Sequence, residues 1–136
     1  MLTLMLLALA APDHKPKATP TPKATAPSAK PTPGPLTKAA LEEYAHADAE
    51  MTAQWKITNA FMKGKDALIK TRGGGFGYAA ALLASQRAWI KYRDAACRVE
   101  GGVHAGDVRQ ALIIAQCKTA LTNARKLQLK GLTVVE

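Results

Sequence analysis

The stretch QRAWIKYRDAAC, residues 86–97, decides the fold class of this chain. At 100° per residue on a helix, one side of the stretch carries Gln86, Trp89, Ile90, Arg93 and Cys97. A glutamine and an arginine therefore share a stripe with a tryptophan and a cysteine. Two interpretations are open. The long polar side chains reach water past an apolar contact, or a buried polar pair holds a small helical domain in register.

The residues on both sides of this stretch predict a small three-helix bundle without strands. Between Thr37 and about Lys130 the chain has no proline and is rich in alanine, leucine, lysine and glutamate, which favour helices. Two glycine clusters divide this part into helices expected at 38–70, at 78–99 and from about 107 onward. The fold class is therefore all-α.

Each predicted helix has an expected start and an expected inward face. Thr37 is expected to cap the first helix and Asp107 the third, and Gly64 is a point where the first helix is expected to break or bend. The inward stripe of the first helix is Leu41, Tyr44, Asp48, Met51, Trp55, Met62 and Ile69. That of the third is Ile113, Cys117, Ala120, Leu121 and Ala124, flanked by Arg125 and Gln128.

Composition limits the core and the class of partner. The chain has 136 residues, and much of its 48% hydrophobic content is alanine, with aromatics at only 5%, so the core is expected to be thin. A formal charge of +9 favours anionic partners such as nucleic acid, phospholipid or cell-wall polymer.

The N-terminal part predicts export, either to the periplasm or out of the cell. Residues 1–10, MLTLMLLALA, form an apolar run that ends in a small-x-small pattern and has no basic residues before it. We expect a signal peptide cleaved after Ala10 and no transmembrane segment afterwards, because ten residues are too few to span a bilayer. A buried N-terminal element is the alternative. Residues 11–36 hold all eight prolines and predict a disordered tether, followed by a folded domain at 37–131 and a tail at 132–136.

Cys97 and Cys117 are the two cysteines of the chain, one on each of two predicted helices joined by a short loop. In an exported protein this arrangement predicts a disulfide that ties a helical hairpin. Two buried free thiols are the alternative. A redox-active pair is disfavoured because the CxxC spacing is absent.

The sequence predicts no enzyme, no metal site and no cofactor. His14, His46 and His104 have no second ligand at helical spacing, and Ser85 has no nucleophile elbow around it. The loop TRGGGFGY at 71–78 lacks both the Gly-Lys-Ser/Thr of a P-loop and the preceding strand of a dinucleotide site, so we interpret it as a flexible connection.

The segments LLASQRAWIKYRDAAC and CKTALTNARKLQL together resemble the lysozyme inhibitor LprI-type domain, a family of small exported helical proteins. The residues that carry the resemblance are Gln86, Trp89, Arg93, Asp94, Cys97, Cys117, Leu121, Thr122, Arg125 and Leu129. Upstream, EYAHADAEMTAQW matches the first helix of the family at Tyr44, Ala47, Asp48, Met51 and Trp55. Many members carry further cysteines near the position of Ala39, so here the first helix is expected to be held by packing alone.

The polar members of this motif are interpreted first as structural. Arg93 and Asp48 are each a charge on an apolar stripe, and each offsets the desolvation of the other if they meet. Gln86 is expected to add hydrogen bonds to the same network. Recognition of a partner is the alternative role.

The resemblance implies inhibition of a lysozyme by occlusion of its cleft. Lysozymes are commonly basic, so the contact would use the minority acidic surface. The acidic candidates are Glu42, Glu43 and Glu50 on the first helix and Asp94 with Glu100 near the end of the second, and we expect Glu42, Glu43 and Glu100 to contact the partner. The rival hypothesis is a cationic module that binds anionic cell-wall polymer or lipid head groups. Its candidate residues are Lys63, Lys65, Lys70, Arg72, Arg87, Lys91 and Arg98. Nucleic-acid binding conflicts with the export signal and with the scarcity of stacking aromatics.

Overall fold

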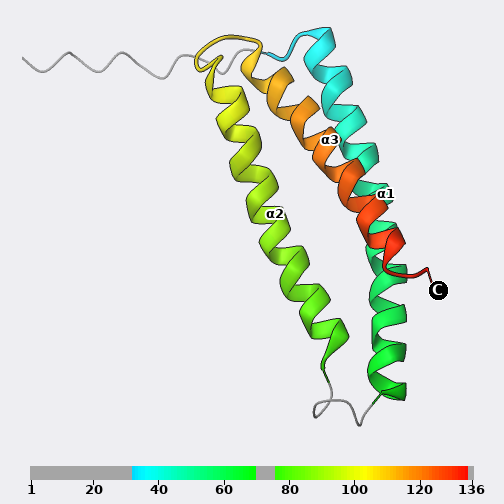
Figure 1. The fold of residues 1–136 in the computed structure, drawn as a ribbon. Coiled ribbons are helices and arrows are strands. Elements are labelled where there is room, and N and C mark those ends of the chain that lie inside the picture. Colours follow the sequence, from blue (N-terminus) through cyan, green and yellow to red (C-terminus); the bar gives the residue numbers. More distant parts are fainter. Residues whose placement is uncertain (1–31, 70–75, 135–136) are drawn as a thin grey trace, which may run out of the picture. The chain divides into compact units, whose positions relative to one another are not determined.

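The computed structural model describes residues 32–69 and 76–134, which form three α-helices (Figure 1). These are α1 Pro35–Leu68, α2 Tyr78–Gly102 and α3 Gln110–Gly131, and the described residues contain no strand. The predicted all-α bundle is confirmed. The predicted signal peptide, the tether as far as residue 31 and the loop residues 70–75 lie outside the described residues.

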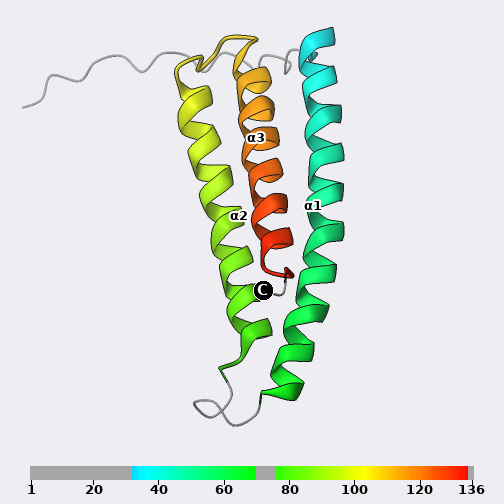
Figure 2. The same cartoon turned by 45° about the vertical axis from the view of Figure 1, so that its right-hand side comes forward.

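Successive helices run in opposite directions, so that the start of α1 lies at the same end as the end of α2 and the start of α3, at the top of both views (Figures 1 and 2). We call this the disulfide end, and we call the opposite end, where α1 stops and α2 begins, the hairpin end. Both views show α3 stopping short of the hairpin end. Packing is most extensive between α1 and α3 and least extensive between α1 and α2.

α1 begins earlier than the sequence predicts. Gly34 occupies the N-cap position and Pro35 lies in the first turn, where its missing N–H and its fixed φ cost nothing. Thr37 is not the cap, because it lies inside the helix with 6% of its surface exposed. The helix also continues through Gly64 to Leu68 without a break.

The apolar core is small, as the composition predicts. Met51, Met62, Leu82 and Leu129 form its centre, and partly buried aromatic side chains such as Trp55 and Trp89 pack against it. Threonines complete it: Thr58 is fully buried, and its hydroxyl donates to the carbonyl oxygen of Leu129 at 3.0 Å. Of the stripe expected on α1, Met51 and Met62 are buried, whereas Leu41 is 43% exposed.

The inward face predicted for α3 is only partly correct. Cys117 is buried as expected and Ile113 and Leu121 are partly buried, but Ala120 and Ala124 are exposed. The buried residues are Ala115, Cys117, Thr119, Thr122 and Leu129. The prediction centred the face on Cys117, whereas most of the buried positions lie on the other side of the helix. Threonine can occupy that side because its hydroxyl bonds to its own helix, as Thr119 does to the carbonyl oxygen of Ala115 at 3.1 Å.

α2 and α3 approach closely at the disulfide end. A Cβ atom at Gly101 would overlap Cγ1 of Ile114, so a larger residue fits there only if the helices or the isoleucine side chain shift. α3 then begins at Gln110, and Asp107 is not its N-cap. Asp107 instead accepts hydrogen bonds from the backbone N–H and the guanidinium of Arg109, both at 2.8 Å, and these bonds lower its pKa to about 2.

At the hairpin end, a single carboxylate joins α1 to the first turn of α2. Asp66 accepts hydrogen bonds from the backbone N–H groups of Tyr78 at 2.6 Å and of Ala79 at 2.9 Å. The first N–H groups of a helix have no partner within the helix, and they carry partial positive charge that favours an anion. Asp66 therefore caps α2 from another helix.

Candidate partner-binding surface

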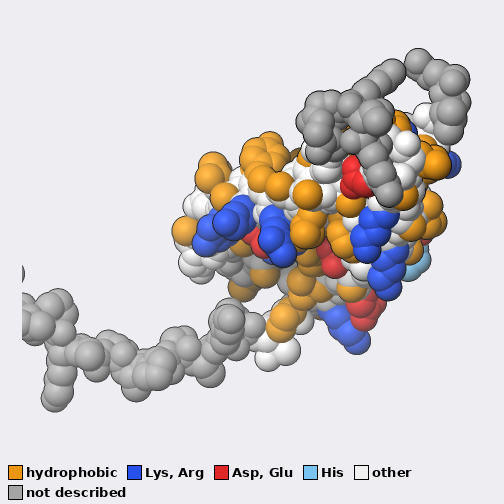
Figure 3. Space-filling model, turned by 90° about the horizontal axis from the view of Figure 1, so that it is seen from below, with side chains coloured by type: hydrophobic (Ala, Val, Ile, Leu, Met, Phe, Trp, Pro, Cys, Tyr) orange, Lys and Arg blue, Asp and Glu red, His pale blue; other side chains and the backbone are white. Residues whose placement is uncertain are grey.

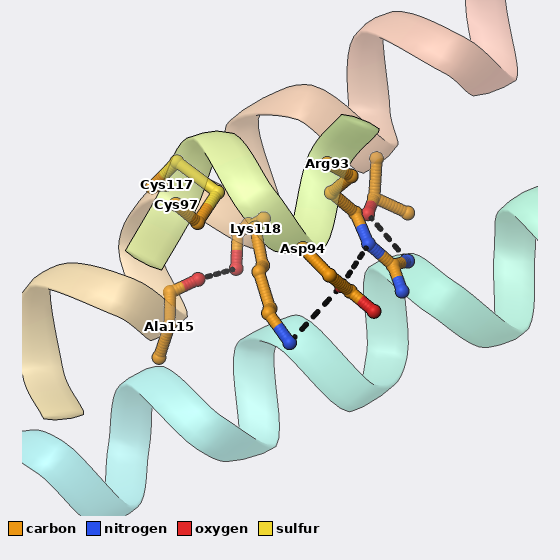
Figure 4. Close-up of a disulfide and its surroundings, with 8 residues drawn as sticks. Arg93, Asp94, Cys97, Ala115, Cys117 and Lys118 are labelled. Atoms are coloured by element: carbon orange, nitrogen blue, oxygen red, sulfur yellow. Dashed lines mark hydrogen bonds and ion pairs between the residues drawn. A yellow bond between two sulfur atoms is a disulfide. The ribbon is translucent and has the colours of Figure 1, made fainter. Parts of the chain in front are cut away.

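The guanidinium of Arg93 is the centre of a polar network between all three helices. Its Nη1 donates to Oδ1 of Asp48 on α1 at 2.9 Å, and its Nε donates to Oδ1 of Asp94 at 3.0 Å. Nη1 also lies 3.5 Å from the hydroxyl of the fully buried Thr122 on α3. The predicted contact between Arg93 and Asp48 is therefore present. Lys118 of α3 reaches the same Asp94 oxygen at 3.1 Å (Figure 4).

Two aromatic rings lie beside this guanidinium. Its central carbon is 5.4 Å from the ring centroid of Tyr44 and 5.1 Å from that of Trp89. A cation at this distance from a ring is attracted by the electrons of its face. The side chain of Arg93 is only 7% exposed, so the carboxylates and the rings together offset the loss of its hydration.

The ionisation of the network follows from these contacts. Burial alone would lower the pKa of Arg93, but the hydrogen bonds to Asp94 and Asp48 and the charge interactions with Tyr44 and Asp94 outweigh it and hold the pKa above its ordinary value. Burial would raise the pKa of Asp94, and the bonds from Lys118 and Arg93 lower it instead. Burial raises the pKa of Tyr44. Arg93 and Asp94 therefore both stay charged at neutral pH.

Gln86 does not join the network of Arg93, contrary to the prediction. It is buried, but its amide oxygen accepts from Nε of Arg125 at 3.0 Å, and its amide nitrogen lies 3.1 Å from the sulfur of Met51. Arg125 also donates to the hydroxyl of Ser85 at 2.9 Å. The guanidinium of Arg125 lies 5.8 Å from the ring centroid of Trp89, so Trp89 contacts both polar clusters.

The predicted disulfide is confirmed. Cys97 and Cys117 are joined with a Cα–Cα distance of 5.5 Å, one helical turn beyond Arg93 on α2 (Figure 4). Both cysteines are buried. The bond therefore fixes α2 against α3 beside the carboxylate of Asp94, which Lys118 contacts from α3.

Two hollows border the network. One of about 310 Å³ lies between α1 and α2, the least packed pair of helices. Its lining includes Asp48, Met51, Trp55, Gln86, Ile90 and Arg93. The indole N–H of Trp55 is buried and has no hydrogen-bond partner among the described residues. The other hollow, of about 410 Å³, lies between α2 and α3 and is lined by Ile90, Lys91, Asp94, Arg98, Ile114 and Lys118.

The three acidic residues predicted to contact a partner are all exposed. Glu42 and Glu43 belong to the early turns of α1, and Glu100 belongs to the last turn of α2, so all three lie toward the disulfide end. The nearest cation to Glu42 is Lys38 at 3.9 Å. Among the described residues, the carboxylates of Glu43 and Glu100 make no ion pair and no hydrogen bond.

Elsewhere in the described part of the chain, few side chains are grouped in a way that suits metal binding or catalysis. Over residues 32–69 and 76–134, no group of three or more histidine, cysteine or acidic side chains is placed to hold a metal ion. In the same ranges, none of the helices has the length and apolar character needed to cross a membrane. His46 lies on the surface 3.8 Å from Glu50, which itself bonds to Lys126 at 2.6 Å.

The profile of the family described as lysozyme inhibitor LprI matches residues 24–129. The chain belongs to the LprI family. An uncharacterized protein of Rhizobium meliloti (strain 1021) is 32% identical over 92 residues, which are 67% of this chain and 66% of that protein. The chain thus spans about two thirds of the length of that relative. No solved structure matches this chain.

The structure gathers most of the residues that carried the resemblance to LprI proteins. Asp48, Arg93, Asp94 and Thr122 meet in the network, and Gln86 meets Arg125. Leu121 and Trp55 are partly buried. Sequence reasoning missed Lys118 and Asp66. Lys118 directly follows Cys117, which is bonded to Cys97 of α2. This neighbourhood in sequence is the signal that could have indicated a contact between Lys118 and α2. Nothing in the sequence indicates that Asp66 caps α2, because this role depends on how the chain turns between the two helices.

Proposed function

We propose that this chain is an exported, non-catalytic domain that binds a lysozyme and blocks its catalytic cleft. Membership in the LprI family, whose description is that of a lysozyme inhibitor, is the observation that carries the proposal. The disulfide supports export, because such bonds persist in oxidising compartments.

The distribution of carboxylates supports a contact at the disulfide end. Most carboxylates of the described residues are already held by donors of the domain within 3.1 Å: Asp48, Glu50, Asp66, Asp94 and Asp107. Glu42, Glu43 and Glu100 have no donor at that distance among the described residues. Their negative charge is available to the basic surface of a lysozyme, and it offsets the repulsion that the net charge of +9 would produce on approach.

The experiment measures the clearing of a cell-wall suspension by a lysozyme in the presence of the full chain, together with the rate of association of the two proteins. We expect inhibition by the native chain. The double variant Glu43→Gln, Glu100→Gln should associate on the order of five-fold more slowly, with the difference shrinking at high salt.

A matched control raises the net charge by the same amount elsewhere on α1. Ala53→Lys with Ala67→Lys changes two exposed positions in its second half. If both double variants slow association equally, net charge and not the disulfide end governs the encounter. If the native chain does not inhibit and is instead retained on anionic cell-wall polymer, the cationic envelope-binding hypothesis replaces this one.

A further inference from the structure

The second half of α1 has an exposed face that no other described helix covers. Its side chains recur at three- and four-residue spacing and are Lys56, Ile57, Ala60, Lys63, Gly64 and Leu68. We call these six residues the distal α1 face. All of them are exposed, Ile57 to 59% and Leu68 to 86%. A Cβ atom added at Gly64 would meet no atom within 4 Å, so the middle of the face is open.

The distal α1 face has no available negative charge. Asp66 is the only acidic residue between Met51 and Leu68, and both of its oxygens accept hydrogen bonds from the first turn of α2. The first half of the same helix is different, since it carries Glu42 and Glu43 on its exposed surface. α1 is therefore acidic toward the disulfide end and basic and apolar toward the hairpin end.

The residue types of this face suit a lipid surface better than a protein. Protein interfaces are enriched in tryptophan, tyrosine and arginine and depleted in lysine, and the distal α1 face has the opposite composition. A helix that lies on a membrane combines lysines with aliphatic side chains that enter the boundary between headgroups and acyl chains. Lysine serves at such a boundary because its stem packs on apolar surface while its ammonium group reaches the phosphates.

The shape of the bundle leaves this half of α1 accessible. α3 ends at Gly131, before the hairpin end, so the last turns of α1 and the first turns of α2 extend beyond it (Figures 1 and 2). Seen from below, Lys and Arg side chains lie next to hydrophobic ones on the surface of the domain (Figure 3).

We propose that the distal α1 face binds the surface of an anionic phospholipid bilayer. Lys56 and Lys63 contact the lipid phosphates, and Ile57 and Leu68 enter the boundary between headgroups and acyl chains. The contact is peripheral, and it differs from the capture of an anionic polymer because the aliphatic side chains contribute to it. It uses the opposite half of α1 from the proposed contact with lysozyme, so the two can form at once.

The test measures partition of the full chain between buffer and vesicles of phosphatidylglycerol and phosphatidylcholine in equal parts. Each lysine near such a surface adds about five-fold to the partition coefficient, so Lys56→Ser with Lys63→Ser should reduce it about thirty-fold at low salt. Ile57→Ser with Leu68→Ser should reduce vesicle binding on the order of ten-fold and leave retention on a soluble polyanion, heparin, unchanged.

Two control pairs match these variants. Lys38→Ser with Lys91→Ser removes the same charge from exposed positions outside the distal α1 face, and Val99→Ser with Val108→Ser removes aliphatic side chains that are 76% and 75% exposed. Both control pairs should bind vesicles as the native chain does. Equal losses of vesicle binding in the test and control pairs would overturn the proposal, as would unchanged vesicle binding in the test pairs. Loss of heparin retention in the serine variants of Ile57 and Leu68 would also overturn it. All variants contain the N-terminal segment, so its lysines contribute equally to each measurement.

Discussion

The disulfide end and the hairpin end of this bundle are held together by different means. At the disulfide end, a covalent bond joins Cys97 to Cys117, and the buried guanidinium of Arg93 joins all three helices. At the hairpin end, Asp66 alone caps the first turn of α2 from α1. One end thus relies on a covalent bond and ion pairs, and the other on the packing of α1 against α2 and one charged cap.

The distribution of apolar side chains explains this difference. The large buried residues Met51, Met62, Leu82 and Leu129 lie in the middle of the bundle and toward the hairpin end. Alanines fill most of the interior toward the disulfide end, among them Ala40, Ala47 and Ala115. Hydrophobic stabilisation scales with the apolar area removed from water, and alanine contributes little of it. Where the core is thinnest, the disulfide and the ion pairs supply the stability that burial does not.

Removal of the disulfide should have the largest effect on this balance. Cys97→Ser with Cys117→Ser should lower the free energy of unfolding by about 3 kcal/mol, because the unfolded chain regains the freedom that the closed loop removed. Denaturant unfolding followed by circular dichroism measures the change. Reduction of the native protein should shift the unfolding midpoint to the same value. An unchanged midpoint would show that packing alone holds the disulfide end.

The close approach of α2 and α3 should be the next most sensitive feature. Gly101→Ala places a Cβ atom against Ile114 and should cost about 1–3 kcal/mol, since the helices must separate or the isoleucine must leave its rotamer. Gly102→Ala is the matched control, because nothing lies within 4 Å of an added Cβ there. Equal thermal midpoints for the two variants would contradict the observed contact.

Loss of the cap at the hairpin end should have a smaller and more local effect. Asp66→Ala leaves the N–H groups of Tyr78 and Ala79 without their acceptor and should cost about 1 kcal/mol. Amide hydrogen exchange at these two residues should become faster while exchange near Cys97 stays slow. Glu43→Ala, which removes a carboxylate without a partner among the described residues, should leave both regions unchanged.

The ion pairs of the disulfide end predict that the stability of the domain depends modestly on pH. The pKa of Asp94 is lower in the folded protein than its ordinary value of about 3.9, so the folded state binds its proton less readily than the unfolded state does. Its contribution is therefore present at neutral pH and is lost as the pH falls below about 4. Asp94→Asn should be less stable than the native chain at pH 6, and the difference should disappear toward pH 2. A difference that is independent of pH would mean that shape and not charge is responsible.

The sequence allowed prediction of contacts in which a residue requires one particular type of partner residue. A charge on an apolar stripe needs an opposite charge, so Arg93 indicated Asp48, and two cysteines in an exported chain indicated each other. The inward face of α3 could not be predicted in this way. Alanine and threonine are compatible with either side of a helix, and only the packing of α3 against α1 decided that Thr119 is buried and Ala120 exposed.

Contacts across the turn between α1 and α2 were also beyond prediction. The sequence between Asp66 and Tyr78 is rich in glycine, which is compatible with many backbone conformations, so nothing local indicates that a carboxylate reaches the N-terminus of the next helix. Gln86 illustrates a further limit. The helical stripe predicted that Gln86 is buried. That it bonds to Arg125 and not to Arg93 depends on which face α3 turns toward α2, which the sequence does not indicate.

The order of the helices along the chain gives the disulfide a kinetic consequence. α1 packs most extensively against α3, the helix farthest from it in sequence, and contacts between distant parts of a chain form slowly because a long loop must first close. Cys97 and Cys117 are only 20 residues apart, so their oxidation can fix the α2–α3 pair before α1 arrives. With that pair fixed, α1 docks on a preformed surface and not on two independent helices. We therefore expect refolding from the oxidised state to be faster than refolding from the reduced state.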